Sequence, residues 1–352
     1  MIRIYSIQDV VDWLVDEKDN GLSAMIISKP RAWAFVNNPC ANPTAPAVAV
    51  LFEDDEMKGY AAVFPERFEG VEPTIYWGST YFVDESMRGK GCGVKILSEL
   101  QNSLDGVYAT MQTPVSSSAI FKKLGAQETW FPEYWIKLQK WNPKRGKHGL
   151  IKLFGNEFYS TFIQHSRRIG RWCDSFHYCL EYCGFVDDET YSFIKDNKRN
   201  DLMLRSKEML NWMLAYPFLV NSALSHRLLP SKNYFSCNKQ DFRQYAVKVF
   251  DEKGRLTGFY IFKCDSGEVN LLYLYYLPES EDMVMASFYE HLMKMGAIRL
   301  RTTSGELVAF IKRRALPILD IFESQLNFCA PATIGVPQGA TIQGGDGDMF
   351  VI

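Results

Sequence analysis

The pattern of hydrophobic and polar positions in the first 140 residues predicts short strands that alternate with amphipathic helices. Two apolar runs, 47–52 and 59–64, are joined by the acidic turn EDDEMK and predict a β-hairpin. Apolar positions at helical spacing predict a helix over 7–17. The expected order then continues with a strand over 73–83, a helix over 93–103, a strand over 107–112, a helix over 116–124 and a strand over 129–139.

A similar pattern returns about 200 residues later. VLFEDDEMKGYAAVF (50–64) and VFDEKGRLTGFYIF (249–262) each contain an apolar strand that ends in Phe, an acidic turn, a glycine and an aromatic strand. SAIFKK (118–123) also corresponds to VAFIKR (308–313). Similarity at one long offset predicts two copies of a fold, although a chance match of a hairpin and a helix is the alternative. Between the copies, 187–214 is expected to be largely helical.

The stretch VDESMRGKGCGVKILSEL (83–100) places three glycines directly before a predicted helix. The first N–H groups of a helix lack partners within the helix, and its dipole makes that end partly positive. Glycines leave these groups open to a ligand, and Arg88 and Lys90 add cationic donors for a phosphate. The sequence therefore predicts an anion site, most simply for phosphate. A tight turn without a ligand is the alternative.

The spacing of these glycines excludes two common phosphate loops. GxxxxGK[ST] is absent, and G-x-G-x-G differs from the dinucleotide fingerprint G-x-G-x-x-G. Arg88-Gly89-Lys90-Gly91-Cys92-Gly93 instead resembles the Q/R-x-x-G-x-G/A signature of the GNAT acyltransferase superfamily. The resemblance implies that backbone amides hold the pyrophosphate of an acyl-CoA such as acetyl-CoA. The implied cofactor-binding residues are Phe82, Val83, Arg88, Gly89, Lys90, Gly91, Cys92 and Gly93.

The order of predicted elements over residues 1–140 is also that of a GNAT domain. We therefore expect an α/β protein with a mixed sheet and two GNAT-like domains in tandem, the second degenerate. The expected parts are an acyl-CoA-binding domain (1–140), a basic and helical connecting region (141–230) and a degenerate domain (231–352). The second copy has PESEDMVM where the first has SMRGKGCG, so we expect a single cofactor site, in the first copy.

The catalytic part of the GNAT pattern is not matched. The resemblance implies an acid on the strand before the loop and a tyrosine on a later helix, and these positions fall near Trp77 and at Phe121. Tyr76 and Ser79 are the catalytic candidates, with packing and an idle hydroxyl as their respective alternatives. Other groups considered are Tyr81, His226 and Glu306.

The expected function is acyl-CoA-dependent N-acyl transfer, with acetyl as the expected acyl group, to a small or lipid-linked acceptor such as an amino sugar. EMLNWML before Pro217 and the tail GGDGDMFVI resemble GNAT-like proteins of bacterial surface-polysaccharide gene clusters. The alternatives are a catalytically silent acyl-CoA-binding or scaffold protein and an amino-acyl transferase that acts on cell-wall precursors. The stretch 344–348 is expected to form a plain turn, because it lacks the remaining oxygen ligands of a calcium-binding loop.

Composition bears on three other properties: binding to nucleic acid, binding of metals and insertion into a membrane. The net charge of −2 gives no general attraction to nucleic acid. Eight cysteines without a C-x-x-C pair favour reduced thiols in the cytoplasm over a metal site. The apolar window 210–229 is too interrupted for a membrane span. The basic segment 140–171 is either a solvated linker or a docking surface for an anionic substrate or lipid headgroup.

Overall fold

The computed structural model describes residues 1–15, 20–68, 71–113, 115–138, 176–221, 238–239, 241–314, 316 and 318–348. The basic segment 140–171 and His226 lie outside these residues. The first half contains a hairpin, as the sequence predicts, together with strand β1 and helix α2, which the sequence analysis did not assign. Its elements are β1 (Ile2–Ser6), α1 (Ile7–Val15), α2 (Lys29–Val36), β2 (Pro46–Glu53), β3 (Glu56–Glu66), β4 (Ile75–Val83), α3 (Cys92–Ser103), β5 (Val107–Met111), α4 (Val115–Lys123) and β6 (Ala126–Lys137).

The second half repeats this order. Its elements are β7 (Tyr178–Cys183), α6 (Asp188–Asp196), α7 (Lys207–Ala215), the short pair β8 (Val220–Asn221) and β9 (Asn238–Lys239), β10 (Phe242–Asp251), β11 (Leu256–Asp265), β12 (Glu268–Tyr276), α8 (Glu281–Lys294), β13 (Arg299–Thr302), α9 (Gly305–Arg313) and β14 (Asp320–Pro331). The stretch 187–214, expected to be largely helical, contains the two helices α6 and α7. Asp187 and Ser206 each cap the start of a separate helix, accepting hydrogen bonds from Thr190 and Met209.

Matching irregularities confirm that the two halves are copies of one fold. The first hairpin shifts register between Leu51 and Phe52, and the second between Val249 and Phe250. The next strand pair shifts after Ala62 in the first half and after Ile261 in the second. Because β-bulges occupy particular places in a fold, their coincidence supports a mixed α/β fold in tandem.

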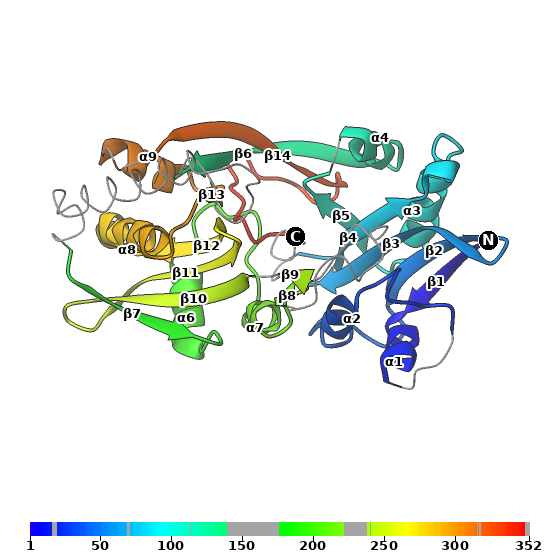
Figure 1. Ribbon diagram of the computed structural model, residues 1–352, viewed down its shortest axis with the longest axis horizontal. Coiled ribbons are helices and arrows are strands. Elements are labelled where there is room, and N and C mark those ends of the chain that lie inside the picture. The colour runs from blue at the N-terminus through cyan, green and yellow to red at the C-terminus, as the bar shows by residue number, and fades with distance from the viewer. Residues whose placement is uncertain are drawn as a thin grey trace, which may run out of the picture.

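The halves are joined by an exchange of strands. The strand order is β1-β2-β3-β4-β5-β14-β6-β13-β12-β11-β10-β7, so one sheet runs through the molecule (Figure 1). β14, the last strand, lies between β5 and β6 of the first half, and β6 pairs in turn with β13 of the second half. The exchange is antiparallel throughout, and β14 pairs with β6 along its whole length.

Helices cover both faces of this sheet. One apolar core, which includes Phe35, Trp77, Trp212 and Tyr273, lies under α1, α2, α6 and α7 and spans both halves. On the opposite face, α3 and α4 cover one core and α8 and α9 cover another. The Trp212 indole donates to the carbonyl of Ala34 at 2.7 Å and so ties α7 to α2.

The predicted domain boundaries at residues 140 and 230 stay a prediction. Residues 178–215, predicted as part of the connecting region, supply the first strand and two helices of the second half. Among the helices of the described residues, none has the length and apolar character needed to cross a membrane.

Candidate active site

The candidate site begins where two parallel strands of the first half separate. β4 pairs with β5 only over Ile75–Trp77, although β4 continues to Val83. Ser79 is the extra residue of the β4 bulge, because Val63 pairs with Gly78 and Ala62 pairs with Thr80. Beyond this bulge, the side of β4 that faces β5 has no strand partner within the described residues, so a gap opens between the strands.

The glycine loop lies at the end of β4. A short 3₁₀ turn (Glu85–Met87) follows the strand, and Asp84 caps this turn by accepting from the backbone of Ser86 at 2.9 Å. Gly89 and Gly91 have φ of +77° and +75°, a left-handed conformation that favours glycine. Gly91 is the N-cap of α3.

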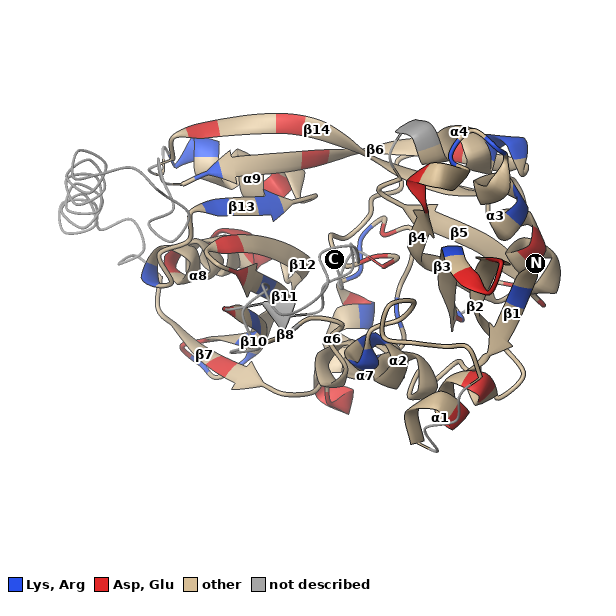
Figure 2. Ribbon diagram, turned by 45° about the vertical axis from the view of Figure 1, so that its right-hand side comes forward, with Lys and Arg blue, Asp and Glu red and all other residues tan. Residues whose placement is uncertain are grey.

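Within the glycine loop, the Lys90 amide donates to the carbonyl of Met87 at 3.3 Å, but the neighbouring amides are open. In the described part of the chain, no hydrogen bond is seen from the amides of Gly89, Gly91, Cys92 and Gly93. These N–H groups, at the partly positive end of a twelve-residue helix, can bind an anion. Basic residues on α3 and α4, the helices beside the loop, add positive charge (Figure 2).

A cavity of about 740 Å³ lies between the glycine loop, the end of β4 and helix α4. Seven of the eight predicted cofactor-binding residues line it, and Lys90 does not; its Nζ lies 3.8 Å from the sulfur of Met87. Arg88 lines the cavity and also pairs with Glu85 at 3.2 Å, both largely exposed. The remaining lining residues are Tyr81, Met87, Val94, Ser117 and Ile120.

Two tyrosine hydroxyls fit against glycines at this site. A Cβ on Gly93 would stand 1.8 Å from the hydroxyl oxygen of Tyr81, and a Cβ on Gly78 would stand 2.2 Å from that of Tyr108. Both glycines are therefore required by packing rather than by backbone angle. Burial raises the pKa of Tyr81 and of Tyr108, so both hydroxyls stay protonated at neutral pH.

The two predicted catalytic residues lie on β4 but do not line this cavity. The Tyr76 hydroxyl, on a nearly fully buried side chain, donates to Asp105. Ser79 is 3% exposed and accepts from the Arg31 guanidinium at both its carbonyl oxygen (2.9 Å) and its hydroxyl (3.2 Å). These contacts indicate that Tyr76 packs in the core and that Arg31 holds the bulge at Ser79 in place. The catalytic assignments of both residues stay predictions.

A buried polar cluster, which the sequence analysis missed, lies beneath the site. Arg205 is 1% exposed and stands 3.2 Å from the carboxylate of Glu66, which also accepts from the Trp77 indole at 2.6 Å. Burial raises the pKa of Glu66 to about 7. Arg205 also donates to the carbonyl of Gly347, so this cluster holds the C-terminal tail. No local sequence pattern indicates it, because its members are far apart in the chain.

The second half also contains a cavity, but the residues before α8, at the position of the glycine loop, do not line it. A cavity of about 420 Å³ lies between β12 and α9 and is lined by Tyr276 and Glu306 among others. Arg199 lies 3.9 Å from the Tyr276 ring centre and pairs with Glu306 at 2.7 Å, so its charge is already matched. Pro278 and acidic residues replace the glycine loop before α8. This cavity does not suit a polyanion.

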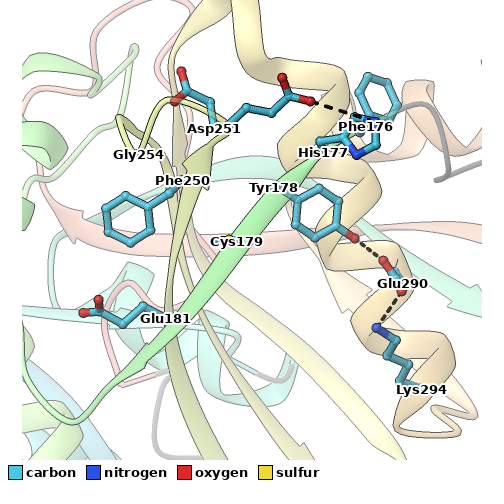
Figure 3. Close-up of a pocket in the computed structure, with 11 residues that line it drawn as sticks. Phe176, His177, Tyr178, Cys179, Glu181, Phe250, Asp251, Gly254, Glu290 and Lys294 are labelled. Atoms are coloured by element: carbon cyan, nitrogen blue, oxygen red, sulfur yellow. Dashed lines mark hydrogen bonds and ion pairs between the residues drawn. The ribbon is translucent and has the colours of Figure 1, made fainter.

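A further cavity, of about 990 Å³, lies at the outer edge of the second half (Figure 3). Its polar side chains pair with one another. Tyr178 donates to Glu290, which also pairs with Lys294 at 2.6 Å, and His177 lies 3.9 Å from Glu252 (Figure 3). Four of its lining residues are acidic, and this too is unfavourable for a phosphate ligand.

No protein-family model matches the sequence, and comparison with curated proteins finds no match. Solved structures with a similar backbone include a GCN5-related N-acetyltransferase from Anabaena variabilis, with 10% identity and a TM-score of 0.48, covering 94% of this chain and 72% of that one. A tandem GNAT protein from the clavulanic acid biosynthesis pathway has 12% identity and a TM-score of 0.47, covering 94% and 97%.

The Saccharomyces cerevisiae N-myristoyltransferase with bound myristoyl-CoA has 11% identity and a TM-score of 0.48, covering 94% of this chain and 82% of that one. The backbone fold of this chain is thus similar to those of GCN5-related N-acetyltransferases, including a tandem GNAT protein.

Proposed function

We propose that this protein is an acyl-CoA-dependent N-acyltransferase whose cofactor site is the glycine loop of the first half. One observation carries the proposal: Gly89, Gly91, Cys92 and Gly93, whose amides are open, line a cavity beside the end of β4, where β4 has separated from β5. A pyrophosphate at these amides would direct the rest of an acyl-CoA along the open side of β4. There, backbone groups without a strand partner can hold an extended chain.

The chemistry requires a neutral amine and a polarised thioester carbonyl. The carbon–nitrogen bond forms while the carbon–sulfur bond breaks, and the thiolate that leaves takes up a proton. We propose acetyl as the acyl group and, as acceptor, a small or lipid-linked amine such as an amino sugar. We propose that Tyr81, which lines the cavity, or Tyr108, whose hydroxyl lies against Gly78 of β4, protonates the leaving sulfur.

Calorimetric titration with acetyl-CoA tests the cofactor site. Gly91→Glu puts a carboxylate beside the open amides and a side chain at φ +75°, and is expected to weaken binding at least about tenfold, or about 1.4 kcal/mol. Gly254→Glu is the matched control, because Gly254 has φ +76° and, like Gly91, nothing within 4 Å of a Cβ. Equal affinity in folded Gly91→Glu and Gly254→Glu would exclude the loop as the cofactor site.

A binding protein without turnover is the second candidate. It is favoured by the contacts of Tyr76 and Ser79, whose hydroxyls are both engaged within the fold. Release of free thiol from acetyl-CoA in the presence of an amine separates the two functions. Tight binding of acetyl-CoA, with no thiol released in the presence of any amine tested, would support a binding protein.

A further inference from the structure

The C-terminal tail, 344–348, crosses from the second half to the strands of the candidate site. A Cβ on Gly344 would stand 2.2 Å from the carbonyl oxygen of Leu271 on β12. A Cβ on Gly347 would stand 2.8 Å from Met111 on β5 and 3.3 Å from Trp77 on β4. The tail is therefore packed tightly across the sheet, between the two halves (Figure 1).

Two aspartates in this tail are equally buried but differ in their contacts. Asp346 is 1% exposed, and both of its carboxylate oxygens accept hydrogen bonds, from the Tyr273 hydroxyl at 3.3 Å and the Gln343 amide at 2.8 Å. Asp348 is 4% exposed, and its Oδ1 has no hydrogen-bond partner. A turn-forming role explains Asp346 but leaves an oxygen of Asp348 unused, at a cost of about 1–3 kcal/mol for a buried polar group.

Asp348 lies among groups that belong to the candidate site. The charges of Arg31 on α2, Lys263 on β11 and Arg205 act on its carboxyl. Its own charge acts on Tyr108, whose hydroxyl occupies the gap beside Gly78. Arg31 also holds the β4 bulge. Gly347, the residue before Asp348, packs against Trp77 on β4 and Met111 on β5, so the tail brings Asp348 to the strands of the candidate site.

We propose that Asp348 is the general base of the acyl transfer. This inference rests on the proposed function. The carboxylate takes a proton from the ammonium form of the acceptor amine, and the neutral nitrogen attacks the thioester carbonyl. The carbon–nitrogen bond forms and the carbon–sulfur bond breaks. The new amide nitrogen loses its second proton, the leaving thiolate takes up one proton to become the CoA thiol, and Asp348 returns its own proton to solvent.

The environment of Asp348 suits this role at neutral pH. Burial raises the pKa of its carboxyl to about 7, against the opposing effect of the three cations. A general base is most effective when its pKa is near the working pH. The rate should therefore rise with pH through about 7, as the carboxyl loses its proton.

The test compares Asp348→Asn with Asp346→Asn in the full chain, using acetyl-CoA with glucosamine as the amine probe and with water alone. Thiol release is followed from pH 5.5 to 9, and acetyl-CoA affinity is measured by calorimetry. For Asp348→Asn we expect kcat to fall about 10²- to 10⁴-fold, the pH dependence near 7 to disappear, and acetyl-CoA affinity to be unchanged. For Asp346→Asn we expect a lower melting temperature with the pH dependence retained.

The outcomes separate this inference from the proposed function. A wild-type protein that does not bind acetyl-CoA overturns both. Binding without thiol release in either assay overturns the role of Asp348 and leaves the cofactor site standing. Turnover by Asp348→Asn at the wild-type rate, or with the same pH dependence near 7, overturns the base assignment alone. Equal loss of that pH dependence in both variants would assign the effect to the tail as a structure and also overturn it.

Discussion

The contact between Gly93 and Tyr81 gives a sharp test of the site geometry. The perturbation is Gly93→Ala, alone and combined with Tyr81→Phe. The added methyl would stand 1.8 Å from the Tyr81 hydroxyl oxygen and 3.1 Å from its Cζ. Phenylalanine removes the first of these contacts and keeps the second.

The magnitude follows from two opposing terms. Alanine in place of glycine in a helix gains up to about 1 kcal/mol, whereas forcing a methyl into a filled space costs about 1–3 kcal/mol. Gly93→Ala should therefore lower the free energy of unfolding by about 0–2 kcal/mol. In the double variant, the ring must shift by only a few tenths of an ångström, so most of the packing cost disappears. We expect a coupling free energy of about 1–2 kcal/mol between the two positions.

Urea denaturation of the four proteins measures this coupling, and calorimetry with acetyl-CoA measures its effect on the site. Gly93→Ala should bind at least about tenfold more weakly than wild type, because displacement of Tyr81 or of the first turn of α3 alters the cavity. Binding should return in part in the double variant. Additive stabilities, with a coupling below about 0.5 kcal/mol, together with full binding by Gly93→Ala, would refute the packing described here.

Three further predictions follow from the same structure. Gly91→Ala and Gly254→Ala should each cost about 1–2 kcal/mol of stability from the left-handed backbone, but only the former should weaken acetyl-CoA binding by calorimetry; equal affinities would contradict this. Burial raises the pKa of Asp346 to about 7, above its unfolded value, so the folded state holds this proton between pH 4 and 7 and loses stability as pH rises through that window. The melting temperature should thus fall from pH 5 to 8 and fall less in Asp346→Asn; identical pH profiles would count against it. Gly258→Ala should lower the free energy of unfolding by about 1–3 kcal/mol, because its methyl would stand 2.4 Å from Val284. Adding Val284→Ala to that variant should partly restore its urea midpoint; no restoration would contradict the contact.

Local patterns in the sequence were enough to predict the hairpins, the glycine loop and the repeat. The hairpins and the loop each depend on residues within about 15 positions of one another, so periodicity and turn chemistry specify them, and the repeat is a recurrence of such local patterns. The glycine loop was recognisable because its function needs bare backbone, and glycine is the residue that provides it.

The features that the sequence analysis missed depend on distant contacts. Buried and exposed residues do not alternate regularly along β14, so its sequence lacks the usual pattern of a strand. Its place between β5 and β6 depends on pairing with strands near residues 110 and 130. Asp348 was assigned to a plain turn, which is what its backbone forms, and only tertiary packing gives its carboxyl its surroundings. Arg31 was missed because Pro30 made α2 hard to assign, although proline is favoured in the first turn of a helix.

The exchanged strand β14 also fixes the order in which the protein can be completed during synthesis. The side chain of Asn327 accepts from the backbone of Thr113 across 214 positions of the chain. At about 5–20 residues per second, the ribosome needs roughly 10–40 s to make that interval. Throughout that time β5 has an open edge, which is prone to pair with other chains. The sheet of the first half is thus completed only when 320–331, made near the end of the chain, pairs with β5 and β6.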